Sequence, residues 1–517
     1  MNAVNPNSSC ILSSSDAATH VNAIRLGLLD AAFFWTLEFV PSVDKVLRDE
    51  LYKISGLLKS VKDYPLIAGF SVSDRVHSDR DPDPITAASH LAMQSGKQPL
   101  VHWSGKGRDI ADLHKSIARM DDMGLENILL LTGDKLKEPT QGDRFRYLES
   151  VPAVEAVKRI NPRLLVAVAL NPFKYREEDC MAQYLKLGKK VGAGADYVVT
   201  QIGFDNAKYQ EGRDWVMQRN YQVPMVANLM PMLARSARYM RKHQLAGVTV
   251  TDGFLALLEA DERLPDQGVS RSMRRLALQI IGVRFMGYAG VQLTGIHTIK
   301  QLAQLQSQFA ELDEFCTDEK TWRQAWNESM SFPHGEIAQA APAQAWYLPE
   351  RKVARATDRQ RLTYRLMQKT HDFLFGNGAG AWVMGKLMRS ITPRHGKLDQ
   401  AAERFEKMIK SPLFGCETCG MCRLEATQYV CPETCPKGLA NGPCGGTTEN
   451  LCEFRDRECI HSVKYRIARD AGVLDQLETW LIPAVPKEIR HSSSYPSHFR
   501  GEGMQVRVVQ FKKPGKV

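Results

Sequence analysis

Short apolar runs alternate with longer amphipathic stretches from about residue 33 to residue 295. The hydrophobicity of each run is continuous rather than alternating, as expected for parallel strands that are covered on both faces. Eight such runs with helical segments between them predict an α/β fold, a closed (β/α)8 barrel, better than an open doubly wound sheet. The runs are Phe33–Phe39, Leu66–Val72, Pro99–Trp103, Asn127–Thr132, Leu164–Leu170, Asp196–Gln201, Val223–Leu229 and Ala289–Thr294.

Helical periodicity is clearest between these runs. Ile110–Met123 is amphipathic, and in Ser270–Met286 apolar residues recur every three or four positions. A further apolar run, Gly247–Thr251, lies in the longer gap before the last predicted strand and leaves the strand count there open.

The pattern changes after about residue 312. Residues 318–410 contain no convincing strand, and Arg361–His371 and Lys397–Ile409 look helical on either side of a glycine-rich turn, Gly376–Gly380. We therefore divide the chain into a flexible N-terminal arm (1–25), a TIM barrel (26–312), a helical linker region (313–410), a small cysteine-rich metal-binding module (411–470) and a C-terminal extension (471–517), which we expect to be mobile or to wrap the surface.

Composition excludes several classes of protein. The chain of 517 residues is 44% hydrophobic and 24% charged, which is ordinary for a globular protein with a sizeable core. Its net charge of +10 is spread out, without interleaved aromatic residues, so we expect no nucleic-acid partner. A basic rim would instead suit an anionic small molecule or an acidic redox partner. No secretory signal and no apolar window long enough to span a bilayer is apparent, so we expect a cytoplasmic protein without membrane attachment.

Cysteine usage is uneven. Cys10, Cys180 and Cys316 are isolated, whereas the other eight cysteines fall within 44 residues; they are Cys416, Cys419, Cys422, Cys431, Cys435, Cys444, Cys452 and Cys459. In a chain without a secretion signal, such a cluster indicates metal binding rather than disulfides. The CxxCxxC triplet and the cysteine–proline pairs are typical of iron–sulfur loops, and eight thiolates suffice for two [4Fe-4S] clusters. Two Cys₄ zinc sites would use the same count, and we favour iron–sulfur.

Polar residues at the ends of the predicted strands mark the expected active face, because chemistry in this fold collects at the carboxyl ends of the strands. Glu38 places a carboxylate inside an apolar run. Such a group is costly to bury unless it has a role in catalysis or in a structural hydrogen bond. Asp134 follows a glycine that would let a ligand approach the backbone, or it caps a turn. The complete set is Glu38, Asp74, His102, Asp134, Asn171, Gln201, Met230 and His297.

These residues carry a resemblance to the methylenetetrahydrofolate reductase family of flavoproteins. The resemblance covers about residues 33–300 and is strongest in LEFVPS at 37–42, GLENILLLTGD at 124–134 and KKVGAGADYVVTQIGFD at 189–205. The last segment, a helix end, a glycine turn, a strand and the TQxxFD terminus, is the most specific of the three.

The resemblance implies roles for individual residues. Glu38 stands at the position of the general acid that protonates N10 and opens the substrate ring to an iminium. Asp134 stands beside the flavin and the pterin, where it would stabilise that positive charge, and Gln201 matches a pterin-binding amide. His102, Asn171 and Lys190 match or lie at flavin-contacting positions. Hydride would then pass between flavin N5 and the exocyclic carbon of the folate.

Three departures from the family pattern bear on flavin and nicotinamide binding. Thr132 replaces a flavin-contacting arginine, Asn171–Pro172 replaces a tyrosine–proline pair, and the last strand ends in TGIH. No GxGxxG motif follows a strand, so no separate nucleotide-binding domain is expected. FAD is the expected cofactor, with FMN as an alternative.

The cysteine module also has a counterpart. KSPLFGCETCGMCRLEATQYVCPETCPKGLANGPCGGT resembles the C-terminal module of certain bacterial methylenetetrahydrofolate reductases, over about residues 360–470. Elsewhere this module is a separate partner subunit associated with iron–sulfur clusters. Fusion of the two parts fixes their stoichiometry and raises their effective concentration.

The leading hypothesis is a flavin-dependent enzyme that interconverts 5,10-methylenetetrahydrofolate and 5-methyltetrahydrofolate. In it the module passes electrons between the flavin and a ferredoxin-like or nicotinamide partner, and the chain forms a possible homo-oligomer. Two alternatives stay open at this point. One is a folate-linked methyltransferase in which thiolate-bound zinc activates a thiol, and the other is a folate-binding barrel with a purely structural zinc module.

Overall fold

The computed structural model describes residues 20–42, 46–62, 64–76, 78, 80–136, 147–348, 354–392 and 394–511. Cys10 and most of the predicted N-terminal arm lie outside these residues. Within them no helix is long and apolar enough to cross a membrane.

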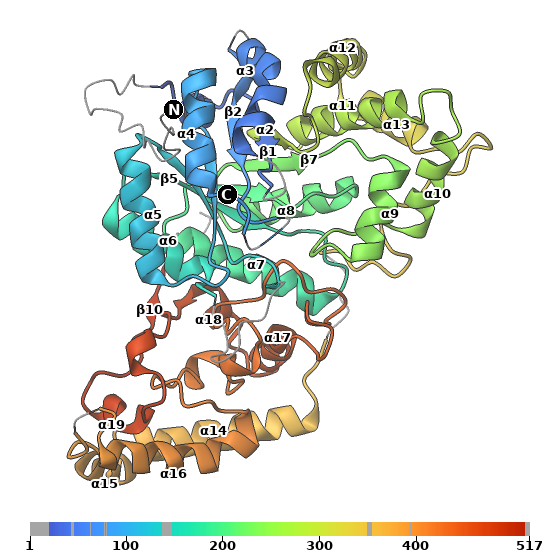
Figure 1. Ribbon diagram of the computed structural model, residues 1–517. Helices are drawn as coiled ribbons and strands as arrows, with labels where there is room; N and C mark the ends of the chain where they lie inside the picture. The colour runs from blue at the N-terminus through green and yellow to red at the C-terminus, as the bar shows by residue number, and fades with distance from the viewer. Residues whose placement is uncertain are drawn as a thin grey trace, which may run out of the picture.

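The centre of the molecule is a closed barrel of eight parallel strands in sequence order, β1 to β8, with β8 paired to β1 (Figure 1). All eight predicted strands are confirmed. Gly247–Thr251 is not a ninth strand but part of the connection between two helices. The strands are β1 (Phe34–Phe39), β2 (Ile67–Val72), β3 (Leu100–Ser104), β4 (Asn127–Leu131), β5 (Leu165–Leu170), β6 (Tyr197–Thr200), β7 (Met225–Leu229) and β8 (Gly290–Leu293).

Helices surround the barrel (Figure 1). The predicted helices at Ile110 and Ser270 are confirmed as α5 and α11. The helices of this part are α1 (Ala23–Leu29), α2 (Leu47–Lys53), α3 (Ser55–Val61), α4 (Pro84–Ser95), α5 (Ile110–Asp122), α6 (Ser150–Ile160), α7 (Glu177–Gly192), α8 (Asn206–Gln218), α9 (Ala234–His243), α10 (Asp252–Asp261), α11 (Val269–Phe285), α12 (Ile299–Phe315) and α13 (Glu319–Ser329).

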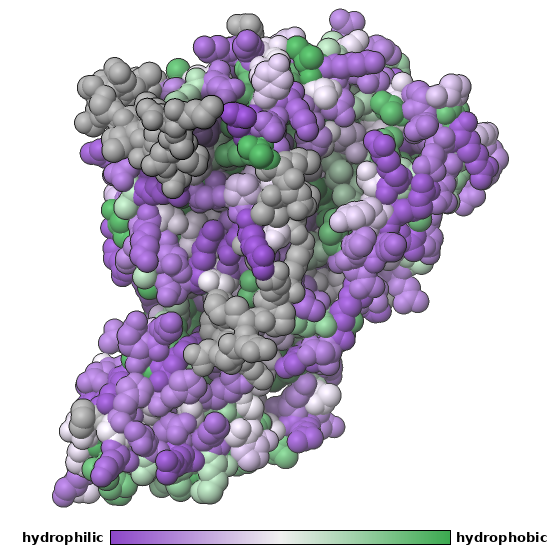
Figure 2. Space-filling model, in the orientation of Figure 1, coloured by the Kyte–Doolittle hydropathy of each residue, from purple (hydrophilic) through white to green (hydrophobic). Residues whose placement is uncertain are grey.

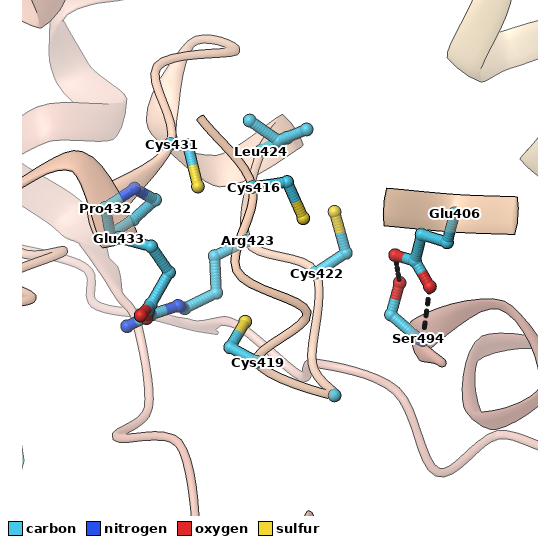
Figure 3. Close-up of a pocket in the computed structure, with 11 residues that line it drawn as sticks. Glu406, Cys416, Cys419, Cys422, Arg423, Leu424, Cys431, Pro432, Glu433 and Ser494 are labelled. Atoms are coloured by element: carbon cyan, nitrogen blue, oxygen red, sulfur yellow. Dashed lines mark hydrogen bonds and ion pairs between the residues drawn. The ribbon is translucent and has the colours of Figure 1, made fainter. Parts of the chain in front are cut away.

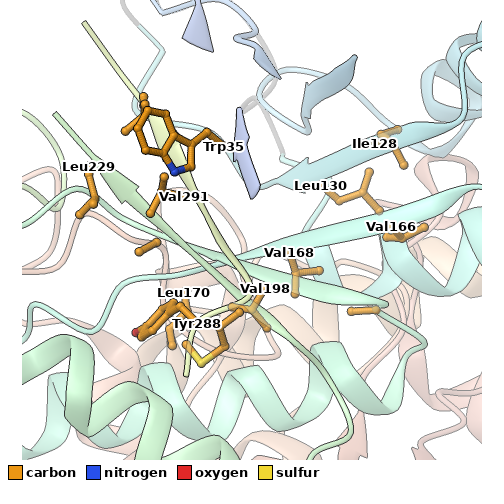
Figure 4. Packing of buried hydrophobic residues seen from close by; sticks show 14 of the residues in the cluster. Trp35, Ile128, Leu130, Val166, Val168, Leu170, Val198, Leu229, Tyr288 and Val291 are labelled. Carbon is orange, nitrogen blue, oxygen red and sulfur yellow. The ribbon is translucent and has the colours of Figure 1, made fainter. Parts of the chain in front are cut away.

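Two hydrophobic layers hold this architecture, because the strands are apolar on both faces. Inward-facing side chains such as Leu129 and Ala167 form a small cluster that fills the barrel. Outward-facing side chains such as Leu130 and Val168 join a much larger cluster beneath the helices (Figure 4). This double burial is the physical origin of the continuous apolar runs in the sequence.

The remainder of the chain forms a second body below the barrel in Figure 1. The two predicted helices here are confirmed, but the glycine-rich turn is followed by a helix, α15, that the pattern did not reveal. Two short strands, β9 and β10, pair antiparallel near the end of the chain. The elements are α14 (Asp358–Phe375), α15 (Ala379–Met388), α16 (Lys397–Phe414), α17 (Ile460–Asp470), α18 (Leu474–Thr479), β9 (Trp480–Leu481), α19 (Ser494–Phe499) and β10 (Arg507–Val508), with 3₁₀ turns at Glu425–Thr427, Pro432–Thr434 and Lys487–Ile489.

Candidate active site and cysteine module

Glu38 lies near the end of β1 at the centre of a hydroxyl network. Its two carboxylate oxygens accept hydrogen bonds from the hydroxyls of Ser73, just after β2, and Thr294, just after β8. The Thr294 hydroxyl also lies 3.0 Å from the side-chain oxygen of Asn228 on β7. Glu38 is half-buried, so its carboxyl group is both held in place by hydroxyl groups and reachable from the barrel mouth.

His102 on β3 extends this network. Its Nε2 is 2.6 Å from the hydroxyl of Ser71, and its Nδ1 is 3.4 Å from that of Ser73. Burial lowers the pKa of His102, and the negative charges of Glu38 and Asp74 oppose that shift without cancelling it. A neutral imidazole can donate one hydrogen bond and accept another, which suits a ring between two hydroxyls.

Asp74 and His297, two other polar residues at strand ends, serve the fold. Asp74 accepts the Ser104 amide at 2.7 Å and forms an ion pair with Arg108 at 2.5 Å, and its side chain is fully buried. His297 is exposed, and its amide donates to Gln301 in the capping box that begins α12. Met230 lines a small cavity beside Arg275 and Trp326, away from the cysteines.

Asp134 is an exposed residue that follows Gly133 at the end of β4. Gly133 has a positive φ of 86°, and a Cβ atom there would lie 2.1 Å from the Ser104 hydroxyl. The glycine is therefore required by the neighbouring β3 loop. Its carbonyl accepts a hydrogen bond from the ammonium of Lys437 at 2.8 Å, which connects the end of β4 with the cysteine module.

Asn171 and Gln201, at the ends of β5 and β6, are brought together beside the connection that follows α9. The Asn171 amide donates to the carbonyls of Gly247 at 2.9 Å and Gly445 at 3.0 Å. The Gln201 amide donates to Ala246 at 3.3 Å. Gly445 directly follows Cys444, so a loop of the cysteine module reaches the mouth of the barrel.

Lys190 lies near the end of α7, and its ammonium donates to the carbonyl of Ala169 on β5. Burial lowers the pKa of Lys190 to about 7, with Lys186 adding to the shift. The predicted flavin contacts Asn171 and Lys190 thus both make hydrogen bonds to the protein, and their part in flavin binding stays a prediction.

Helix α7 carries most of the junction with the module. Lys174, just before the helix, donates to the carbonyls of Gly445, at 2.8 Å, and Thr447. On the helix itself, Gln183 donates to the Cys444 carbonyl at 2.7 Å. Helices α17 and α18 pack along α7, so the face of α7 that points away from the barrel is buried by the C-terminal part of the chain (Figure 1).

Glu149, the residue before α6, is the centre of this junction. It accepts hydrogen bonds from the amides of Ala440 at 3.1 Å and Asn441 at 3.0 Å, and its carboxylate lies 2.9 Å from the Lys186 ammonium. Burial alone would raise the pKa of Glu149, but Lys186 and the Asn441 hydrogen bonds lower it to about 2. Glu149 is therefore ionised at neutral pH although it is only 6% exposed.

Four cysteines line one cavity, which we call the outer tetrad: Cys416, Cys419, Cys422 and Cys431 (Figure 3). The Thr418 amide donates to the Cys416 sulfur at 3.4 Å, and the Lys410 ammonium lies 3.4 Å from the Cys422 sulfur. The buried guanidinium of Arg423 lies beside the same thiols and pairs with Glu433 at 2.6 Å. Cationic and amide donors of this kind stabilise thiolates.

We group the other four cysteines as the inner tetrad: Cys435, Cys444, Cys452 and Cys459. Cys435 and Cys444 belong to one hydrophobic cluster with Leu439. Burial raises the pKa of both Cys459 and Cys452, and Cys435 adds to each shift. Cys444 belongs to the loop that contacts Asn171 and α7, so this tetrad is the one next to the barrel.

The outer tetrad would suit a thiolate-ligated group, since its four sulfurs line one cavity with an amide and two cations nearby. Among the described residues, no group of three or more histidine, cysteine, aspartate or glutamate side chains forms a metal-binding arrangement. The predicted metal ligands therefore stay a prediction.

The barrel mouth offers an apolar surface with polar groups around it. Leu131 and Ala169 continue the inward-facing rows of β4 and β5, but they are half-buried where the residues below them are buried. Glu38, His102 and Gln201 lie on or just after β1, β3 and β6, and an apolar surface with a few polar groups is typical of ligand pockets.

Several residues of the site escaped sequence reasoning. Ser73, Asn228 and Thr294 around Glu38 are small polar residues at strand ends, and position alone could have drawn attention to them. Glu149 and Lys174 lie outside the strands, and their partners in the cysteine module are more than 270 residues away along the chain. No local pattern marks such residues.

Comparison with known proteins agrees with this arrangement. The profile for methylenetetrahydrofolate reductase matches residues 24–282, half of the chain, and the profile for the methylene-tetrahydrofolate reductase C terminal matches residues 396–486. Methylenetetrahydrofolate reductase 1 of Schizosaccharomyces pombe is 29% identical over 163 residues, covering 30% of this chain and 26% of the relative. Methylenetetrahydrofolate reductase 2 of Saccharomyces cerevisiae is 23% identical over 198 residues, covering 36% and 32%.

The chain thus spans about a quarter to a third of the length of these curated relatives. Among solved structures, a Clostridium thermocellum protein described as binding two copies of 5-methyl-5,6,7,8-tetrahydrofolic acid superimposes with a TM-score of 0.43 at 12% identity, covering 56% of this chain and 99% of that protein. That similarity is too low to support an inference. On the strength of the two family profiles, one over the barrel and one over the cysteine module, this chain belongs to the methylenetetrahydrofolate reductase family.

Proposed function

We propose that this protein interconverts 5,10-methylenetetrahydrofolate and 5-methyltetrahydrofolate with a bound flavin, FAD or FMN, and that its cysteine module holds two [4Fe-4S] clusters that exchange electrons with that flavin. Family membership supports the reaction. The observation that carries the electron-transfer part is the contact between Asn171 at the barrel mouth and Gly445, the residue after Cys444, at 3.0 Å.

Glu38 is the proposed general acid. The hydroxyls of Ser73 and Thr294 fix its carboxyl group by donating hydrogen bonds to it when it is ionised, and a hydroxyl can equally accept a hydrogen bond from it when it is protonated. Glu38 can therefore hold the proton destined for N10 of the substrate and take it back in the reverse direction. General acid catalysis of this kind contributes a factor of about 10² to 10⁴ in rate.

Asp134 and Gln201 are the proposed substrate contacts. The exposed carboxylate of Asp134 would stabilise the positive charge of the ring-opened substrate. Gln201 uses one amide hydrogen on Ala246 and its oxygen on the Ile202 amide, which fixes its orientation and leaves a second amide hydrogen for the pterin.

His102, Asp134, Asn171 and Lys190 would hold the flavin, which supplies the hydride chemistry when bound. The neutral state favoured for His102 means that this contact adds no charge to the pocket. The junction with α7 would exclude water from the side of the mouth nearest the inner tetrad. A ferredoxin-like protein or a nicotinamide is the proposed external electron partner.

The test uses full-length protein purified without oxygen. Its ultraviolet–visible spectrum and its iron and zinc contents should report flavin and iron together. With reduced viologen as electron source, Glu38→Gln should lower the rate of 5-methyltetrahydrofolate formation by about 10²-fold or more while the flavin stays bound. Glu259→Gln is the control and should leave the rate unchanged, because Glu259 is a half-exposed carboxylate of α10 paired with Arg238 of α9.

Colourless protein that contains zinc but no flavin or iron would contradict the proposal. In that case a zinc-dependent methyltransferase, or a folate-binding barrel with structural zinc, would describe the chain better. Full activity of Glu38→Gln would remove Glu38 from the mechanism.

A further inference from the structure

Three helices of the C-terminal body expose an unusual number of large apolar side chains. We call this surface, formed by α14, α15 and α16, the outer apolar face. Its side chains are between 41% and 69% exposed, and apolar residues are visible along the lower edge of Figure 2. They are Leu362, Leu366 and Phe373 on α14, Trp382, Val383 and Leu387 on α15, and Leu398, Phe405, Met408, Ile409 and Leu413 on α16.

Burial on α16 is the reverse of that in an ordinary surface helix. The side chains that α16 buries are Asp399, Glu406 and Lys410, while Phe405 and Met408 face solvent. Helix α14 buries none of its 18 residues. An exposed apolar patch of this kind marks an interaction site, because covering it would release a free energy of about 25 cal/mol per Å².

The outer apolar face is also basic. Helices α14 to α16, all of whose residues the structure describes, carry seven exposed basic side chains and two exposed acidic ones. The basic ones are Arg359, Arg365, Lys369, Lys386, Lys397, Arg404 and Lys407, and the acidic ones are Asp358 and Asp372. Such a rim attracts an acidic partner and accelerates its association.

This face is continuous with the outer tetrad. Leu413 lies in the last turn of α16, Gly415 ends the helix in a left-handed conformation, and Cys416 follows immediately. Lys410 on the same helix lies 3.4 Å from the sulfur of Cys422. A protein bound to the exposed side of α16 would therefore lie one helix away from the outer thiols, on the side of the module away from the barrel.

We propose that the outer apolar face is the docking surface for a small acidic electron-carrier protein. This inference rests on the proposed function and identifies where the electron partner binds. Electrons would be exchanged at the outer tetrad, while the inner tetrad faces the barrel mouth. Reduction of one methylene group consumes two electrons and two protons, so two one-electron carriers are oxidised in each turnover and the protons come from solvent.

Repeated exchange requires a carrier that binds briefly, as in electron-transfer complexes with interfaces below about 1,200 Å². Charge favours the acidic carrier over a second copy of this chain, whose net charge is +10 and whose symmetric pairing would set one basic rim against another. An anionic membrane surface would match the charge but would make no use of the adjacent thiols.

The test measures binding of an acidic [4Fe-4S] ferredoxin to the anaerobically purified full-length protein by biolayer interferometry at increasing salt. Two double variants alter the face, Phe405→Ser with Met408→Ser and Arg404→Glu with Lys407→Glu. The control is Lys53→Glu with Lys59→Glu, exposed lysines on α2 and α3 at the opposite end of the molecule (Figure 1). Circular dichroism and flavin content verify folding of each variant.

The wild-type protein and the control variant should bind ferredoxin equally, and each face variant should raise the Kd at least 10-fold. The charge variant should also lose most of the salt dependence. Viologen-driven folate reduction should be unchanged in both face variants, because neither touches the barrel. Equal ferredoxin affinity for the wild type and both face variants would overturn the proposal.

Two other occupants would overturn it as well. Co-sedimentation with phosphatidylglycerol vesicles that is lost in the face variants, without ferredoxin binding, would assign the face to a membrane. A concentration-dependent dimer that dissociates in those variants would assign it to a second copy. If viologen drives no folate reduction but ferredoxin still binds this face, the proposed function fails and the docking surface stands.

Discussion

The barrel core and the junction between the barrel and the cysteine module are both buried, yet they are built from opposite kinds of side chain. The core around Leu130 and Val168 contains aliphatic groups packed in two layers. The junction contains the buried side chains of Glu149, Lys186 and Lys464 and a network of hydrogen bonds to backbone carbonyls and amides.

The two regions differ in how strictly each fixes the relative position of the elements that it joins. Apolar packing depends mainly on the area removed from water, so it tolerates small shifts between the packed elements. A buried carboxylate is stable only where its donors are within hydrogen-bonding distance, so the junction permits only one placement of the module. Such a placement suits a module whose Gly445 loop must meet Asn171 at the barrel mouth.

The largest effect is expected from Glu149→Gln. The substitution leaves the Lys186 ammonium buried without its carboxylate and should destabilise the junction by about 3–5 kcal/mol. Hydrogen exchange should increase in residues 437–445 and 460–482 more than in the barrel strands. Glu155→Gln, in the helix that follows Glu149, is the control, because Glu155 pairs with the exposed Arg507. Equal exchange in the two variants would show that the charge does not hold the junction.

Truncation of a core side chain should destabilise the barrel rather than the junction. Leu130→Ala removes a fully buried side chain of β4 and should lower the free energy of unfolding by about 2–5 kcal/mol. The loss should appear as a lower thermal midpoint of the barrel, while exchange at the junction under native conditions changes little. Leu66→Ala, at a position 42% exposed, is the control. If Leu130→Ala instead increased hydrogen exchange mainly in residues 437–445, this expectation would be wrong.

Acid should affect the junction before the core, and by a smaller amount. The pKa of Glu149 is lowered to about 2 from an ordinary value of 4.5, so its stabilisation is complete above pH 4.5 and is lost as the pH falls toward 2. At pH 3 the loss should be about 2 kcal/mol. Hydrogen exchange at the junction, compared with that of β4 between pH 6 and pH 3, measures it. Glu149→Gln should lack this pH dependence, and its persistence would assign the titration to another group.

Much of the barrel could be predicted from the sequence. Each strand is apolar on both faces, and this produces a run of consecutive apolar residues. The ends of all eight predicted strands therefore lie within two residues of the observed ends. Helix α15 was missed because its apolar residues are exposed rather than buried against a core, and the glycines before it resemble a simple turn.

The candidate site, too, could be predicted only in part from the sequence. Glu38, His102, Asn171 and Gln201 were identified because parallel strands bring their carboxyl ends to one face. The Ser73 and Thr294 partners of Glu38 come from strands at opposite ends of the barrel sequence, and only closure of β8 onto β1 brings them together.

The sequence by itself determined the eight strands, the polar residues at their ends and the eight clustered cysteines, since these are properties of residues close together along the chain. Only the tertiary structure placed Cys431 in the cavity of the outer tetrad and Cys435, four positions on, in a separate cluster with Cys444. It also brought Gly445 to Asn171 across 274 residues. Contacts of that range depend on how separate elements pack, and no local pattern of residues encodes them.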